Sequence, residues 1–184
     1  MKEITIHGRG GQGAVTSSQI LAVAAFYDGK ECQAFPMFGV ERRGAPVEAF
    51  ARISDKPITL RSQVYNPNYI MVLDSTLLAN GSKILETNHG AKIFINSSKN
   101  PKELGSSNGN VFSVDVTKKA LEIIGKPFVN IGMLGAFSAL SGEISLPSLE
   151  KAILEVMGSN DTGEKNRKLA VEVFNSVKKQ NGGN

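Results

Sequence analysis

The glycine-rich segment at residues 8–13, GRGGQG, is the part of this sequence best suited to chemistry. Glycine tolerates positive φ and has no side chain to hold a ligand off the backbone, so such a loop at the start of a helix can aim several N–H groups at an anion. Between the glycines lie Arg9, which is always charged, and Gln12, an amide that both donates and accepts. We therefore predict that Gly8, Arg9, Gly10, Gly11, Gln12 and Gly13 form a phosphate-binding loop.

A strand and a helix must position this loop. Ile4 and Ile6 alternate with polar residues, which predicts a strand over residues 3–7, and the chain after the loop is expected to be helical to about residue 28. The loop thus satisfies the G-x-G-x-x-G fingerprint of dinucleotide-binding folds in its usual context. In those folds an acidic residue about 20 positions later, at the end of the second strand, binds the ribose hydroxyls. Here the second strand, at residues 31–35, ends in Phe35-Pro36, so that acid is missing.

Three interpretations of the loop remain open. The glycines make only a tight turn, or they bind NAD or FAD, or they contact another phosphate-bearing ligand or a neighbouring subunit. The missing acid disfavours the second interpretation, and Arg9 and Gln12 favour the third.

A second motif, ERRG at residues 41–44, follows the second strand. Arg42 and Arg43 are either ordinary solvated charges or a pair that binds phosphate or a partner's carboxylate, for which the planar guanidinium is suited. After this motif, apolar residues from Val47 to Ile53 alternate with Glu48, Phe50 and Arg52, which predicts a strand with one more exposed face.

The composition sets limits on the protein class. The chain of 184 residues is 41% hydrophobic and 21% charged, which is typical of a single globular domain over residues 1–184. Every apolar run is shorter than about 18 residues and no secretory signal is visible, so we expect a cytoplasmic protein that does not cross a membrane. One cysteine and two histidines, far apart, predict no metal site, and the net charge of +4 without a basic run disfavours nucleic acid.

Short apolar runs alternate with helical patterns along the rest of the chain. Strands are predicted at residues 69–74, 91–96 and 111–114. Helices are predicted from residue 116, at 130–140, with Pro147 in a first turn, and at 162–179, and the chain end at 175–184 is expected to fray. The alternation indicates an α/β fold, a single Rossmann-like domain with a mostly parallel sheet and helices on both faces.

Two features of these elements bear on function. Asp74 ends its strand at the sheet edge where α/β folds bind ligands, although it is also placed to cap a short helix at 76–79. Residues 130–140 are apolar nearly all round, which predicts burial in the core or against another subunit, and is compatible with a homodimer of the isolated chain.

The glycine loop, the segment FGVERRGAPVEAFARIS after the second strand and the small-residue helix begun by Asn130-Ile131-Gly132 occur together in one known family. In these motifs the chain closely resembles the gamma subunit of 2-oxoacid:ferredoxin oxidoreductases, most of all the pyruvate type. The resemblance extends from about residue 2 to residue 175, and it is specific because two motifs recur in the same order and spacing.

The resemblance implies a subunit of a larger enzyme. In that family, alpha, beta, gamma and delta parts together decarboxylate a 2-oxoacid oxidatively, with CoA as acyl acceptor and ferredoxin as electron acceptor. Thiamine diphosphate lies between the alpha and beta parts and iron–sulfur clusters lie on the delta and beta parts. Carried over to this chain, the glycine loop and Thr16 would approach a CoA phosphate or an active-site neighbour. Arg42 and Arg43 would bind a CoA phosphate or a carboxylate of the alpha subunit, and no residue here is expected to be catalytic.

Overall fold

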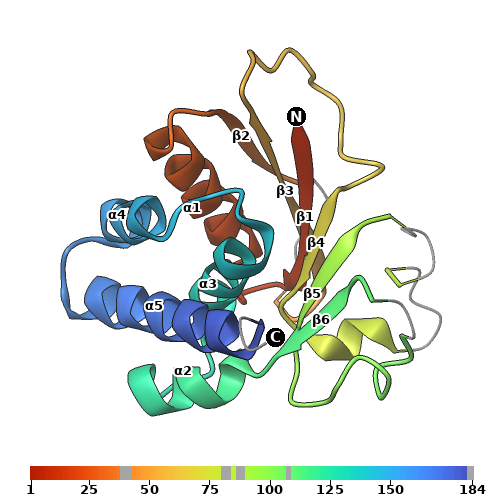
Figure 1. Cartoon of the computed structure of the whole chain (residues 1–184), viewed down its shortest axis with the longest axis vertical. Coiled ribbons are helices and arrows are strands. Elements are labelled where there is room, and N and C mark those ends of the chain that lie inside the picture. The colour runs from red at the N-terminus through yellow and green to blue at the C-terminus, as the bar shows by residue number, and fades with distance from the viewer. Residues whose placement is uncertain (38–42, 80–83, 86–89, 107–108, 182–184) are drawn as a thin grey trace.

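The chain folds around one six-stranded sheet, shown with its helices in Figure 1. The computed structural model describes residues 1–37, 43–79, 84–85, 90–106 and 109–181. The strands are β1 (Lys2–Arg9), β2 (Glu31–Pro36), β3 (Pro46–Ser54), β4 (Tyr69–Val72), β5 (Lys92–Asn96) and β6 (Val111–Val114). The helices are α1 (Ala14–Tyr27), the 3₁₀ helix η1 (Ser75–Leu78), α2 (Val116–Ile124), α3 (Asn130–Ser141), α4 (Leu146–Met157) and α5 (Asp161–Asn181).

The strand order β2-β3-β1-β4-β5-β6 confirms a mostly parallel α/β sheet with one departure. β1, β4, β5 and β6 pair in parallel, whereas β3 lies between β1 and β2 and is antiparallel to both. The part of the β2–β3 connection that the structure describes, residues 37 and 43–45, contains no helix, and a connection without a crossover helix favours antiparallel pairing. The end of β2 is therefore two strand spacings, about 10 Å, from the glycine loop after β1.

The two faces of the sheet are covered unequally. Alternate strand residues such as Ile4, Met71 and Phe94 belong to one large core that also contains buried side chains of α1 to α5. The opposite face of β4 and β5, with Ile70 and Ile95, packs in a smaller cluster against η1 and adjoining segments. Figure 1 shows the five α-helices on one side and η1 on the other. Helices on both faces were expected, but in the described chain the second face carries only the short 3₁₀ helix.

β3 is buried on both faces from Ala49 to Ser54, so the expected exposed face is a wrong prediction for this part of the strand, although Glu48 near its start is half-buried. Phe50 and Arg52, which alternate with the core residues, are 2% and 1% exposed. The Arg52 guanidinium donates to Glu3 (Nε to Oε1, 2.8 Å) and to the carbonyl of Ser62 (Nη2 to O, 2.7 Å). The loop between β3 and β4 is held over this face by these bonds, which is why a charged residue is tolerated inside.

α3 is the buried centre of the helical layer. Nine of its residues, from Ile131 to Ala139, are buried, and glycines let α5 approach closely. A Cβ at Gly135 would lie 2.2 Å from the Ala170 carbonyl oxygen of α5. The expectation of burial is thus met within the chain itself, and this segment is not a surface for a second copy. α5 continues to Asn181 with Val177 2% exposed, so the described part of the expected tail is helical rather than frayed.

We predict that Gly135→Ala destabilises the chain by roughly 2 to 3 kcal/mol, because the added methyl group overlaps the backbone of α5 and the two helices must separate. The measurement is the free energy of unfolding in denaturant. Gly109→Ala is the matched control, since a Cβ there meets nothing within 4 Å. Equal stability of the two variants would contradict the close α3–α5 packing.

Candidate functional site

The glycine loop turns the chain from the end of β1 into α1 at positive φ. Gly11 and Gly13 have φ of +94° and +82°, a region that side-chain-bearing residues rarely adopt. Gly13 is the N-cap of α1 and provides no side-chain cap. The first bond at the helix start runs from the Ser17 N–H to the Gly13 carbonyl (2.9 Å), so the N–H groups from Ala14 to Thr16 have no intrahelical acceptor. This open, partly positive helix end is suited to an anion.

The loop is braced by its own side chains and by the second motif. Gln12 Oε1 accepts from the Arg9 N–H at 2.7 Å, while the Gln12 N–H donates to the Arg9 carbonyl at 2.9 Å. The Gly10 N–H donates to the Ala45 carbonyl (2.8 Å), and the Gly44 N–H donates to the Gly10 carbonyl (3.1 Å). The two motifs that are some 30 residues apart in sequence are therefore in direct backbone contact.

Asp74 joins this loop to the next β-to-helix turn. Its Oδ2 accepts from Arg9 Nε (3.2 Å) and Gln12 Nε2 (3.0 Å). Its Oδ1 accepts from the N–H (3.0 Å) and the hydroxyl (2.6 Å) of Thr76, and so caps η1. The interpretation of Asp74 as a helix cap is therefore confirmed, and its position at the carboxyl end of β4 is as expected, while ligand binding at this edge stays a prediction.

The environment of Asp74 keeps its carboxylate charged. Burial alone raises its pKa, but hydrogen bonds from Thr76 and Gln12 and the positive charge of Arg9 together hold the pKa below its ordinary value of 3.8. An ionised carboxylate whose oxygens each accept two hydrogen bonds is a poor general base. The site therefore uses Asp74 for structure rather than for proton transfer.

Asn96 plays the equivalent part at the end of β5. Its Nδ2 donates to the Leu73 carbonyl (3.1 Å) and to Thr117 Oγ1 (3.0 Å), and its Oδ1 accepts from the N–H groups of Val116 and Thr117, each at 3.2 Å. Asp115 completes the cap by accepting from the Lys118 N–H at 3.0 Å. The N-terminus of α2 is thus already satisfied by protein groups, unlike that of α1.

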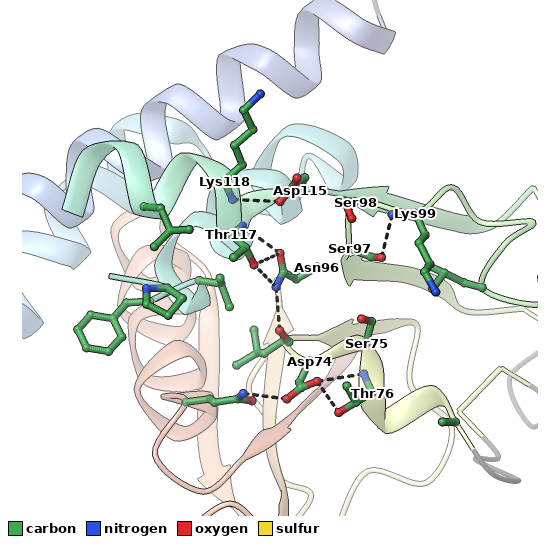
Figure 2. A pocket seen from close by; sticks show the side chains of 18 of the residues that line it. Asp74, Ser75, Thr76, Asn96, Ser97, Ser98, Lys99, Asp115, Thr117 and Lys118 are labelled. Carbon is green, nitrogen blue, oxygen red and sulfur yellow. Dashed lines mark hydrogen bonds between the residues drawn. The ribbon is translucent and has the colours of Figure 1, made fainter. Parts of the chain in front are cut away.

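A hollow of about 1060 Å³ lies where these turns meet, beyond the carboxyl ends of the strands. Figure 2 shows Asp74 and Thr76 on one wall and Asn96 and Thr117 on another, with the Lys118 side chain pointing away from Asp74. Gly11 and Gln12 line it from the glycine loop, and the start of α3 adds the apolar group Pro127, Phe128 and Val129. The hollow therefore combines an apolar wall with hydroxyl, amide and lysine groups.

A smaller hollow of about 470 Å³ adjoins the first. The two share Ser97, Ser98, Lys99, Asp115 and Lys118, and the smaller one also includes Lys119. Asp115 is engaged as a cap, and Glu122 is the other acid in this lining, against the three lysines Lys99, Lys118 and Lys119. This favours an anion.

The predicted site residues divide into groups in the structure. Gly11 and Gln12 line the large hollow, Gly8 is buried under the loop, and Arg9 is engaged with Asp74, Gly44 and Thr76. Gly10 pairs with Ala45, and Gly13 packs on Asn130 at the start of α3. Thr16 is half-buried and lies outside the lining, and Arg43 is exposed beside Gly44. Arg42 and Glu41 lie outside the described residues.

Sequence reasoning missed the second half of the site. Asn96, Ser97, Lys99, Thr117 and Lys118 follow the ends of β5 and β6. Their signal was the rule already applied to Asp74, that polar residues directly after parallel strands gather at one edge.

Within the described ranges no group of three or more His, Cys, Asp or Glu residues is arranged to hold a metal ion. None of the described helices is long and apolar enough to cross a bilayer.

Comparisons with known proteins give a consistent result. Residues 3–176 match the family described as pyruvate ferredoxin/flavodoxin oxidoreductase. Pyruvate synthase subunit PorC of Methanocaldococcus jannaschii is 50% identical over 99% of this chain and 100% of its own length. The pyruvate/ketoisovalerate oxidoreductases common subunit gamma of Thermococcus kodakarensis is 48% identical over 96% of this chain and 97% of its own. The crystal structure of pyruvate oxidoreductase subunit PORC from Thermotoga maritima is 33% identical, covers 95% of this chain and 97% of its own, and has a TM-score of 0.79.

The lowered pKa of Asp74 predicts an acid-dependent loss of stability. A carboxyl group with a depressed folded pKa stabilises the fold above its unfolded value of about 3.8, and this contribution is lost as the pH falls through the lower folded value. The measurement is the free energy of unfolding against pH for the purified chain and for Asp74→Asn. The variant should be less stable at pH 7 and should lose less stability below pH 4; parallel curves would contradict this prediction.

Asn96→Ala should lower the free energy of unfolding by about 2 to 4 kcal/mol, because the buried Leu73 carbonyl and the first N–H groups of α2 lose their partner. Asn110→Ala, at an exposed position, is the matched control and should change it by less than about 0.5 kcal/mol. Chemical denaturation measures both, and an Asn96 variant as stable as the control would show that the bridge contributes nothing.

Proposed function

Because this chain belongs to the pyruvate ferredoxin/flavodoxin oxidoreductase family, we propose that it is the gamma subunit of a multi-subunit pyruvate-type 2-oxoacid:ferredoxin oxidoreductase. The complex decarboxylates a 2-oxoacid oxidatively, transfers the acyl group to CoA and passes the electrons to ferredoxin. Its partners are the alpha, beta and delta subunits. The cytoplasmic location expected from the sequence is part of this proposal.

The choice of 2-oxoacid is assigned to the partner subunits. The relative from Thermococcus kodakarensis is named as a gamma subunit common to pyruvate and ketoisovalerate oxidoreductases. A gamma chain that serves two substrates does not itself select between them. At 48% identity over 96% of this chain, that relative supports the same division of labour here.

The contribution of this chain is to hold the phosphates of CoA in the hollow at the sheet edge. The observation that carries this proposal is the hollow of about 1060 Å³, which Gly11 and Gln12 line directly before the open N-terminus of α1. CoA carries a diphosphate and a separate 3′-phosphate, and the two adjoining hollows offer a place for each. Lys99 and Lys118 lie in the lining of both, and ammonium groups are good phosphate partners.

The other predicted residues receive supporting roles. Gly8, Gly10 and Gly13 shape the loop, and Thr16 supplies one of the open N–H groups of α1. Arg42 and Arg43 remain proposed partners of a CoA phosphate or of an alpha-subunit carboxylate. Thiamine diphosphate on the partner subunits supplies the carbanion chemistry when bound, and iron–sulfur clusters there accept the electrons.

Two alternatives fit less well. A self-sufficient NAD or FAD enzyme needs a ribose-binding acid at the end of its second strand, and here β2 ends without an acid and is separated from β1 by the antiparallel β3. The named relatives are also subunits of 2-oxoacid oxidoreductases. A pure scaffold that binds nothing small is separated from the proposal by the following measurement.

The test is steady-state kinetics of the complex captured anaerobically through a tag on this chain. We expect Lys99→Ala with Lys118→Ala to raise the KM for CoA about tenfold, because two charge-assisted contacts to phosphate are lost, while kcat is unchanged. Lys56→Ala with Lys168→Ala removes two exposed lysines elsewhere and should leave the KM unaltered. An unchanged KM in the first variant would favour the scaffold, and recovery of the chain alone, without iron, would overturn the subunit proposal.

A further inference from the structure

The guanidinium of Arg9 uses three of its five N–H groups in contacts within the protein. Nε donates to Asp74 Oδ2 (3.2 Å), Nη1 donates to the Gly44 carbonyl (3.2 Å), and Nη2 donates to Thr76 Oγ1 (2.8 Å). These three contacts use all three nitrogens of the side chain. Arg9 is therefore a tether between segments, although its place in the glycine motif predicted a ligand contact.

Asp74 lies in the lining of the hollow, yet it offers a ligand nothing. Both carboxylate oxygens already accept two hydrogen bonds each, and Arg9 neutralises the charge. Without that pairing, a carboxylate in the wall of an anion site would repel phosphate. The ion pair thus removes an obstacle to anion binding at the same time as it fixes the wall.

Three irregular segments meet at this pair. The glycine loop provides Arg9 and Gln12, the second motif provides the Gly44 carbonyl, and η1 provides Thr76. The parallel ladder between β1 and β4 ends at His7 and Val72, before the glycine loop and η1 begin, and from there the chain continues to opposite sides of the strand order. The pair is what sets the distance between the open end of α1 and the opposite wall of the hollow.

We infer that Arg9 and Asp74 act together as positioning residues that set the affinity of the complex for CoA without touching it. This inference rests on the proposed function of the hollow. It assigns to Arg9 a role different from the phosphate contact expected from its motif, and it gives Asp74 a role in the enzyme beyond capping η1.

The central test is Asp74→Asn in the assembled complex. The amide places an N–H₂ group against the donors of Arg9 or Gln12, so the loop shifts and the KM for CoA should rise about tenfold. The kcat at saturating CoA and the KM for the 2-oxoacid should stay within about twofold, because a contact that matters equally in ground and transition states changes only binding. Glu150→Gln removes the charge of the Glu150 carboxylate that pairs with Arg167 Nη1 (2.7 Å) between α4 and α5 and is the control, with no change in the KM for CoA.

Two further measurements separate positioning from direct contact and from misfolding. Arg9→Gln combined with Asp74→Asn should raise the KM no more than the larger single effect, because the pair acts as one unit. Thr76→Val keeps the charges of Arg9 and Asp74, and because Thr76 is exposed we expect this variant to fold. It should raise the KM for CoA about threefold. In the free chain without CoA, both Asp74→Asn and Thr76→Val should speed amide hydrogen exchange in residues 10–16.

The outcomes distinguish this inference from the proposed function. If the Lys99 and Lys118 changes raise the KM for CoA but Asp74→Asn and Thr76→Val do not, the positioning role is wrong and the CoA site stands. If none of the changes alters the KM, both ideas are wrong. A raised KM with unaltered hydrogen exchange in residues 10–16 would also overturn positioning, since Asp74 would then act on CoA directly.

Discussion

The site depends on the carboxylate of Asp74, whose two oxygens each accept two hydrogen bonds at the crevice between the ends of β1 and β4. Asp74 follows β4, the glycine loop follows β1, and from there the chain proceeds to opposite ends of the strand order. Where the chain leaves two neighbouring parallel strands in opposite directions, a crevice forms between their ends. The crevice keeps one shape only if contacts join its two walls. The donors around Asp74 provide these contacts, because Arg9 and Gln12 join Asp74 to the glycine loop while Thr76 holds the carboxylate in its own turn.

The helical layer supplies the second fixed reference. α3 lies between the sheet and α5 at a distance that only glycine permits, and its first residue packs on Gly13 at the start of α1. The two helix starts beside the hollow are therefore fixed by core packing, whereas the wall formed by η1 is fixed by polar contacts. Core packing and polar contacts together therefore fix the shape of the hollow.

Local patterns were enough to predict the elements, because each depends on the residues within it. Val111 to Val114 and the helix capped by Asp115 and ended by Gly125 were placed correctly from β-branched content, a capping residue and a glycine. The insertion of β3 between β1 and β2 was not predicted, since pairing partners are set by contacts distant in sequence. The burial of Arg52 was missed for the same reason, because the loop that covers it lies between β3 and β4.

The sequence predicted only one half of the residues that form the site. The glycine motif and Asp74 were visible in the sequence, but the role of Arg9 was not, because its three acceptors come from two segments more than 30 residues away in the chain. Asn96 was overlooked because an asparagine at a strand end is common, and only the structure shows it joining β4 to α2.

The most direct test of the account is a structure of the assembled complex with CoA bound. The account predicts that a phosphate of CoA lies within hydrogen-bonding distance of the N–H groups from Ala14 to Thr16 or of Lys99 or Lys118, with the Arg9–Asp74 pair intact and not in contact with CoA. CoA bound elsewhere, with the hollow filled by a side chain of a partner subunit, would contradict it and identify this chain as a scaffold.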